Sequence, residues 1–251
     1  MVTTLYLIRH GETEGSETKH YKGSIDVPMS KNGVEQIRKT SAFIQNMIQD
    51  AGYRIQDKKN HESCIVHRAS SKLSAVYCSP LSRALKSAEI IAESNGLNPI
   101  VISDLRERSF GVWEGMTFTE IKERYPQEFE AWAGNPLRYS PVDGESTIEV
   151  RDRAVSALNK IIDNHSCNRI QDTGCRIQDK KNHEACIMNL ASSSIAIVAH
   201  GGVNRIILCH IMGIPLENIF RIEQDFAAVN IIEFWEKYPV VKLINGQASL
   251  E

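Results

Sequence analysis

The sequence has no apolar run approaching the roughly 20 residues that a membrane-spanning helix needs. Charge of neither sign dominates, since 29 Lys and Arg face 31 Asp and Glu, for a formal net charge of -2. This balance favours neither a nucleic-acid partner nor a polybasic membrane contact. The first residues also lack the basic segment and apolar region of a secretion signal. We therefore expect a cytoplasmic protein with no membrane and no nucleic-acid partner.

Several motifs of well-known chemistry are missing as well. The chain has no G-x-S-x-G and no G-x-x-x-x-G-K-[ST] segment, which disfavours a serine hydrolase and a P-loop enzyme. Its six cysteines show no C-x-x-C spacing, so we expect reduced thiols rather than disulfides or a zinc site. No cluster with metal-ligand spacing is apparent. The sequence thus predicts neither a metal nor a cofactor.

The 251 residues instead contain alternating strand-like and helix-like segments. This alternation, at a length that one α/β domain often reaches, predicts a single domain spanning 1–251. The expected fold is a three-layer α/β/α sandwich whose mixed sheet is mostly parallel and ends in an antiparallel hairpin. The expected strands are 3–8, 73–78, 195–199, 228–235 and 240–244, and the expected helices lie near 34–48, 85–92, 148–162 and 201–210.

An internal repeat interrupts this pattern. Residues 48–71 recur as 170–193 and are identical at 18 of the 24 positions. Two isolated copies do not tile the chain as solenoid or propeller repeats do. We expect duplicated surface insertions, because long loops add little closure entropy. The alternative is a metal or partner site formed by Asp57, His61, Cys64 and their copies.

The most informative segment is LYLIRHGET, residues 5–13, an apolar run that stops at Arg9 and His10. Ligands of open α/β sheets bind at the carboxyl ends of the strands, so both side chains are expected at the ligand crevice. A guanidinium fork suits phosphoryl oxygens, and an imidazole nitrogen can attack phosphorus. His200 follows a second strand-like run in AHGG, and two such strand ends can converge on one crevice.

Helix starts supply further candidates. In SPLSRA, residues 79–84, Ser79 or Ser82 is expected to cap a helix, which places Arg83 in the first turn. A cation is unfavourable at this positive end of the helix dipole, so Arg83 suggests an anion opposite it. Farther along the chain, Ser146 and Glu149 fit a capping box.

A carboxylate completes the set. The loop LRERSFGVWEG, residues 105–115, places acids beside aromatic residues, where a carboxyl group of raised pKa can protonate a leaving oxygen. Spacing alone leaves Glu107, Glu114 and Asp104 open as candidates. Two imidazoles, two guanidiniums and one acid together predict chemistry on a small phosphomonoester. The oligomeric state is open, with a homodimer as one option.

In this order and spacing, the motifs resemble those of the histidine phosphatase superfamily, also called the phosphoglycerate mutase-like family, over nearly everything outside the two repeat copies. The resemblance implies that His10 in RHGET is a nucleophile that becomes a phosphohistidine. It selects Glu107, in a Leu-x-Glu segment, as the acid–base carboxylate and His200 as the second pocket histidine. The phosphoryl- and substrate-binding residues that it implies are Arg9, Gly11, Thr13, Ser16, Gly23, Arg83 and Gly201.

Positions 16 and 22 have less certain counterparts in the family pattern. Ser16 stands where an Asn commonly follows the family signature, with Gly15 before it, and both can still reach a phosphate. Lys22 lies in HYKGSIDVP, residues 20–28, a strip that resembles a second part of the family's pocket. Its ammonium is either a substrate contact or a solvated charge.

Within the family, FGVWEG (residues 110–115) is similar to the phosphatase branch. The segment EQDFAAVNIIEF (residues 223–234) and the terminal hairpin resemble α-ribazole phosphatases, which remove the phosphate of a cobalamin precursor. The expected substrate is therefore α-ribazole 5′-phosphate. The alternatives are a phosphoserine or broad-specificity sugar phosphatase, a cofactor-dependent phosphoglycerate mutase and a non-catalytic phospholigand-binding protein.

Overall fold

The computed structural model describes residues 2–17, 20–53, 72–167, 193–235 and 238–248, and within them six strands form one sheet. The sheet order is β3-β2-β4-β1-β5-β6. The neighbouring strands β3, β2, β4 and β1 are all parallel. Strand β5 runs antiparallel to β1, and β6 runs antiparallel to β5. The predicted mixed sheet with its terminal hairpin is therefore confirmed. The strands are β1 (Thr3–Arg9), β2 (Ala75–Cys78), β3 (Ile100–Val101), β4 (Ser193–Ala199), β5 (Val229–Phe234) and β6 (Pro239–Gly246).

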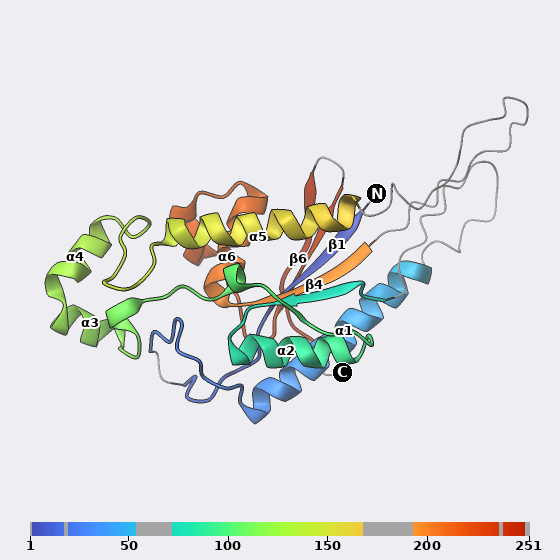
Figure 1. The fold of residues 1–251 in the computed structure, drawn as a ribbon, viewed down its shortest axis with the longest axis horizontal. Coiled ribbons are helices and arrows are strands. Elements are labelled where there is room, and N and C mark those ends of the chain that lie inside the picture. The colour runs from blue at the N-terminus through green and yellow to red at the C-terminus, as the bar shows by residue number, and fades with distance from the viewer. Residues whose placement is uncertain (1, 18–19, 54–71, 168–192, 236–237, 249–251) are drawn as a thin grey trace, which may run out of the picture.

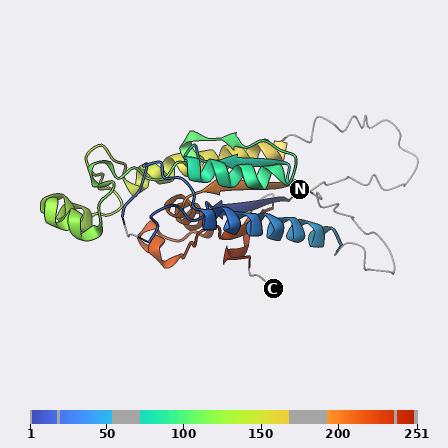
Figure 2. The same ribbon diagram turned by 90° about the horizontal axis from the view of Figure 1, so that it is seen from below.

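Helices cover both faces of the sheet (Figures 1 and 2). Successive side chains of β1 alternate between two apolar layers, as the pleat requires. Leu5 and Leu7 pack with α5 (Thr147–Cys167) and α6 (Gly201–Met212). Tyr6 and Ile8 pack on the other face, under α1 (Lys31–Tyr53) and α2 (Ser82–Glu93). The predicted three-layer α/β/α sandwich is confirmed.

Two short helices lie away from the sheet, at one end of the molecule in both views (Figures 1 and 2). They are α3 (Phe118–Arg124), which begins with a Thr117–Glu120 capping box, and α4 (Pro126–Gly134). No residue of α4 is buried. The hydrophobic periodicity of the sequence did not predict this pair, nor the two-residue strand β3. Three 3₁₀ turns complete the description: η1 (Ser103–Leu105), η2 (Gly111–Trp113) and η3 (Leu216–Arg221).

The two capping predictions had different outcomes. Ser146 and Glu149 form the predicted capping box at the start of α5. The prediction for α2 was wrong, since the capping position is Leu81, whose side chain makes no capping hydrogen bond. The two serine hydroxyls are engaged elsewhere. Ser79 Oγ lies 2.7 Å from His200 Nε2, and Ser82 Oγ donates to Asp26 Oδ1 at 2.7 Å.

Most of the repeat lies outside the described residues, including Asp57, His61 and Cys64. The insertion prediction and the alternative metal or partner site therefore both stay predictions. The first copy begins inside α1, where Ile48 is buried in the core. The second copy ends at Ser193, the first residue of β4. A deletion that keeps the fold would therefore have to spare the start of the first copy, which belongs to α1, and the end of the second copy, which belongs to β4.

Two further sequence expectations concern membranes and thiols. In the described part of the chain, no helix is long and apolar enough to cross a membrane. Cys78 and Cys209, in the same part, are buried free thiols.

The loop after β1 docks on the start of α1. Glu12 accepts hydrogen bonds through its carboxylate from the Ser30 hydroxyl (3.0 Å) and the Asn32 amide (2.8 Å). Gly33, inside α1, passes so close to the Glu12 backbone that an added Cβ would overlap Glu12 O and lie 2.7 Å from Glu12 N. The glutamate of the RHGE motif thus anchors a helix.

We predict that Gly33→Ala lowers the free energy of unfolding by about 1–3 kcal/mol, because the backbone must shift to admit the methyl group. The measurement is urea denaturation followed by circular dichroism. Gly134→Ala is the matched control, since Gly134 is also helical and an added Cβ there meets nothing within 4 Å. Equal stabilities of the two variants would contradict the close packing.

Candidate active site

Strand register places the two histidines side by side. In the parallel pair β1 and β4, Arg9 is opposite Ala199, so the next residues are His10 and His200. The His10 N–H donates to Ala199 O at 3.1 Å, and the two ring centroids are 5.1 Å apart. Strand β2 ends on the other side of β4, where the Ser79 N–H donates to Val198 O. Three strand ends thus meet at one crevice.

The geometry of His10 identifies the ring nitrogen that holds the lone pair. Nδ1 lies 2.7 Å from the carbonyl oxygen of Gly11. A carbonyl oxygen can only accept, so Nδ1 carries the proton and Nε2 holds the lone pair of a neutral ring. Burial lowers the pKa of His10 well below its usual 6.5, and the charges of Arg9 and Arg83 lower it further. His10 is therefore neutral at physiological pH.

His200 is fully buried at the residue before α6. Its Nε2 pairs with Ser79 Oγ, while Nδ1 has no hydrogen-bond partner among the described residues. Burial lowers the pKa of His200, and His10, Arg83 and Arg9 add to the effect. Such an unsatisfied buried nitrogen is uncommon and fits a site that receives a polar ligand.

Arg9 extends from the end of β1 under an aromatic cover. Its Nη1 donates to Gln224 O at 2.6 Å, and its guanidinium carbon lies 3.8 Å from the centroid of the Phe226 ring. Nε is buried without a partner in the described part of the chain. Burial, opposed in part by Glu107, lowers the pKa of Arg9 to about 10, so the side chain remains charged.

Arg83 occupies the first turn of α2, as the sequence predicted, and is buried. Its guanidinium donates to Ile25 O and Gly23 O, both at 2.8 Å. These bonds tie the strip around residues 20–28 to α2. Gly23 in this strip has a φ of +48°, which favours glycine, and an added Cβ would lie 2.9 Å from Arg108 O.

Of the three candidate carboxylates, Glu107 lines the cavity and the other two do not. Its oxygens accept the N–H groups of Arg108 (3.0 Å) and Gly202 (3.1 Å). An added Cβ on Gly202 would lie 2.6 Å from Glu107 Oε1, so glycine there permits the approach. Glu114 instead accepts from the backbone and hydroxyl of Ser24.

Arg9, His10, Arg83 and Glu107 line one cavity of about 590 Å³ with two chemically distinct parts, and His200 is not among its lining residues. Its floor, at the strand ends, carries the positive charges of Arg9, Arg83, Lys22, Arg108 and Arg205 around His10 and Glu107. Its outer wall is apolar and comes largely from α3, α4, η2 and η3. The wall residues include Phe110, Trp113, Phe118, Ile121, Phe129, Trp132, Leu216, Ile219 and Phe220.

The remaining residues that were predicted to bind substrate fall into two groups, those that line the cavity and one that does not. Thr13, Ser16, Gly23 and Gly201 line the cavity. Gly11 is not among the lining residues: its N–H donates to Ser87 Oγ at 3.2 Å, and it packs against Gly33 of α1. The geometry gives Gly11 a packing role.

Sequence reasoning left the role of Lys22 open, and the lining residues that it missed include Arg108, Arg205 and Phe226. Lys22 Nζ lies at the cavity and donates to Thr13 Oγ1 (3.0 Å) and Glu14 O (2.6 Å). Arg205 was detectable, because it lies five residues after His200 on α6. Phe226 gave no signal, since its place over Arg9 depends on the loop before β5.

Comparison with known proteins gives consistent results. The chain is 24% identical to phosphoserine phosphatase 1 of Hydrogenobacter thermophilus, over 96% of this chain and 91% of that protein. It is 23% identical to the adenosylcobalamin/alpha-ribazole phosphatase of Escherichia coli, over 97% and 96%. The crystal structure of the alpha-ribazole phosphatase from Shigella flexneri superposes with a TM-score of 0.71 at 20% identity, over 99% of this chain and all of that one.

A family model for the histidine phosphatase superfamily (branch 1) matches residues 5–53, 61–171 and 180–247. Both interruptions of the match fall inside the repeat copies. The matched residues include every candidate catalytic side chain and make up most of the sequence. The chain therefore belongs to the histidine phosphatase superfamily.

Proposed function

We propose that this phosphatase hydrolyses a small phosphomonoester through a covalent phosphohistidine on His10. The observation that carries the proposal is the convergence of a neutral His10, an acid (Glu107) and two buried arginines in one cavity. Positive charge on the floor suits a phosphoryl dianion, and the orphaned Nε of Arg9, a lining residue, supplies a donor for its oxygens. The orphaned Nδ1 of His200, whose ring centroid lies 5.1 Å from that of His10, is a second donor.

In the first step, the lone pair of His10 Nε2 attacks phosphorus in line with the leaving oxygen. The P–O ester bond breaks as the P–N bond forms, and protonated Glu107 gives its proton to the departing alkoxide. Arg9, Arg83 and His200 hold the equatorial oxygens. Each such charge-assisted contact typically stabilises the transition state by ~2–4 kcal/mol.

The second step regenerates the enzyme. Ionised Glu107 takes a proton from a water molecule while its oxygen attacks phosphorus. The P–N bond breaks, inorganic phosphate leaves, and His10 returns to its neutral form. One carboxyl group thus serves both steps, first as acid and then as base.

The outer wall indicates the leaving group. A ring of phenylalanine and tryptophan side chains from α3, α4 and η3 suits an apolar aromatic group better than a sugar. We infer that the substrate is α-ribazole 5′-phosphate, whose base is a fused aromatic ring. The names of the similar E. coli and S. flexneri proteins support this choice.

Phosphoserine is the second candidate. Arg205 lines the same cavity, with Nε bonded to Ile222 O at 2.7 Å, and would pair with a substrate carboxylate. The similar phosphoserine phosphatase of H. thermophilus points the same way. The apolar wall favours the aromatic substrate over this one.

We predict that His10→Ala loses at least about 10³-fold in phosphate release while it keeps its fold, because no other group forms the covalent intermediate. Acid-labile radiolabelled phosphate should be trapped on the wild-type protein and not on the variant. The control is His210→Ala, since His210 is exposed on the last turn of α6. Turnover that survives in His10→Ala would overturn the covalent route.

A second prediction concerns the protonation of His10. Because its pKa is lowered, the ring should remain neutral, with the proton on Nδ1, as the pH falls through 6.5. The unfolded chain takes up this proton first, so acidification below about 6.5 lowers the free energy of unfolding. Nitrogen-15 NMR titration of the imidazole measures both tautomer and pKa. A midpoint at or above 6.5 would contradict the prediction.

The third prediction tests the substrate. With α-ribazole 5′-phosphate, phosphoserine, sugar phosphates and phosphoglycerates, kcat/KM should be highest for the first. Trp132→Ala should lower that value about tenfold and leave phosphoserine nearly unchanged, because only the aromatic group packs on the wall. Trp235→Ala is the control, since Trp235 lies half exposed at the end of β5. A preference for phosphoserine, or phosphoglycerate interconversion without phosphate release, would favour the alternatives.

A further inference from the structure

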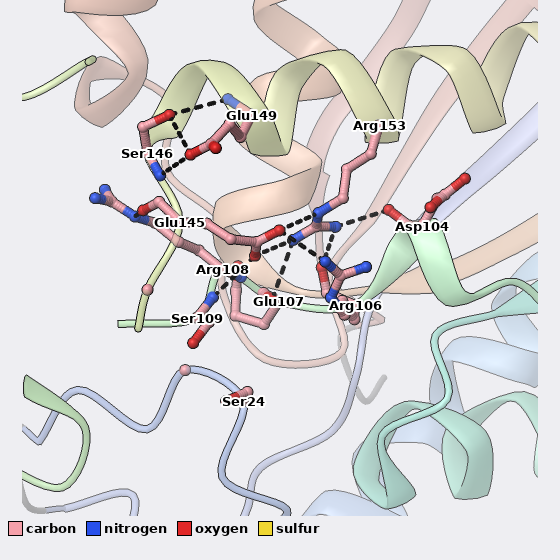
Figure 3. A network of polar contacts seen from close by, with 12 residues as sticks. Ser24, Asp104, Arg106, Glu107, Arg108, Ser109, Glu145, Ser146, Glu149 and Arg153 are labelled. Carbon is pink, nitrogen blue, oxygen red and sulfur yellow. Dashed lines mark hydrogen bonds and ion pairs between the residues drawn. The ribbon is translucent and has the colours of Figure 1, made fainter. Parts of the chain in front are cut away.

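A polar network surrounds the segment that carries Glu107 (Figure 3). Arg153 projects from α5, and Glu145 lies two residues before that helix. Neither residue lines the cavity. We call this pair the Glu145–Arg153 clamp.

One face of the clamp binds the backbone before the acid. Arg153 Nη1 donates to the carbonyl oxygens of Asp104 and Arg106, both at 2.7 Å. Its Nη2 reaches the carbonyl oxygen of Glu107 itself at 3.2 Å. The Arg153 side chain is 10% exposed, so these bonds lie in a largely dry environment where they are strong. A single planar guanidinium thus fixes three carbonyl groups of one segment.

The other half of the clamp fixes Arg153 and the backbone after the acid. Glu145 binds Arg153 through both carboxylate oxygens, to Nε and Nη2, each at 2.8 Å. It also accepts from Arg106 Nη2 (2.8 Å) and from the Ser109 N–H (3.1 Å). In return, the Glu145 N–H donates to Ser109 O at 2.9 Å.

The charge state of the clamp is stable. Burial by itself would raise the pKa of Glu145, but the Arg153 hydrogen bonds, the Ser109 N–H and the charges of Arg153 and Arg106 outweigh it and lower the pKa. The carboxylate therefore stays ionised at neutral pH. A buried bidentate pair of this kind has a defined geometry that a solvated loop lacks.

We propose that the Glu145–Arg153 clamp positions Glu107 for proton transfer to the leaving group. The clamp holds the backbone on both sides of residue 107, so the carboxyl group can meet the Arg108 and Gly202 N–H groups at the cavity. Proton transfer needs this placement to within a fraction of an ångström. The inference rests on the proposed function, in which Glu107 is the acid.

The test compares two esters in single-turnover phosphorylation of His10. An alkyl phosphomonoester such as phosphoserine needs a proton on its leaving oxygen, whereas p-nitrophenolate leaves without one. For Arg153→Lys and Glu145→Gln, the alkyl ester should react about 10²-fold more slowly and p-nitrophenyl phosphate at most about threefold more slowly. Arg151→Gln is the control on the same helix, since Arg151 contacts Asp152 and is 40% exposed.

The ratio of the two rates carries the test, because it does not depend on how much of a variant is folded. An unchanged ratio would overturn the clamp's positioning role, and so would full alkyl activity. Adding Arg153→Lys to Glu107→Gln should cause no further loss of the ratio, since the clamp acts through Glu107. If Glu107→Gln alone leaves the ratio unchanged, the acid assignment in the proposed function fails instead.

Discussion

The parallel pairing of β1 with β4 is the constraint on which the site depends. Its register sets Arg9 opposite Ala199, and the next residue of each strand is a histidine. A slip of one residue would turn one imidazole to the other face of the sheet and separate the pair. The alternating apolar side chains of β1, buried on both faces, fix that register. Core packing therefore determines the distance between the two rings.

Burial of the strand ends also determines which side chains of the candidate site carry charge. Two imidazoles, Arg9 and Arg83 lie together at the strand ends, and protonation of either ring would add a like charge in a poorly solvated place. The rings are consequently neutral and the arginines charged. In the proposed function, a phosphoryl dianion compensates this positive charge. The apolar wall would then contact the group that the phosphoryl oxygen carries.

The sequence predicts the sheet and the catalytic floor because both depend on local patterns. Strand ends follow directly from apolar runs, and His10, His200 and Arg83 come one to five residues after them. The α2 cap was predicted wrongly, because tertiary contacts to Asp26 and His200 engage the two hydroxyls. Periodicity could not predict α3 and α4, which bury little and so show no clear apolar stripe. Phe226 could not be predicted either, because its place over Arg9 depends on the loop before β5.

Because α4 has no buried residue, ring contacts hold it, with Phe129 on Phe118 at 4.9 Å and Trp132 edge-on to Trp113 at 6.4 Å. Segments of this kind open at a free energy far below that of global unfolding, and their amide hydrogens exchange early. Substitutions on α4 therefore cost the domain little stability. In the proposed function, α4 supplies Phe129 and Trp132 to the wall that the leaving group contacts, so its substitution would alter substrate range at little cost to the fold.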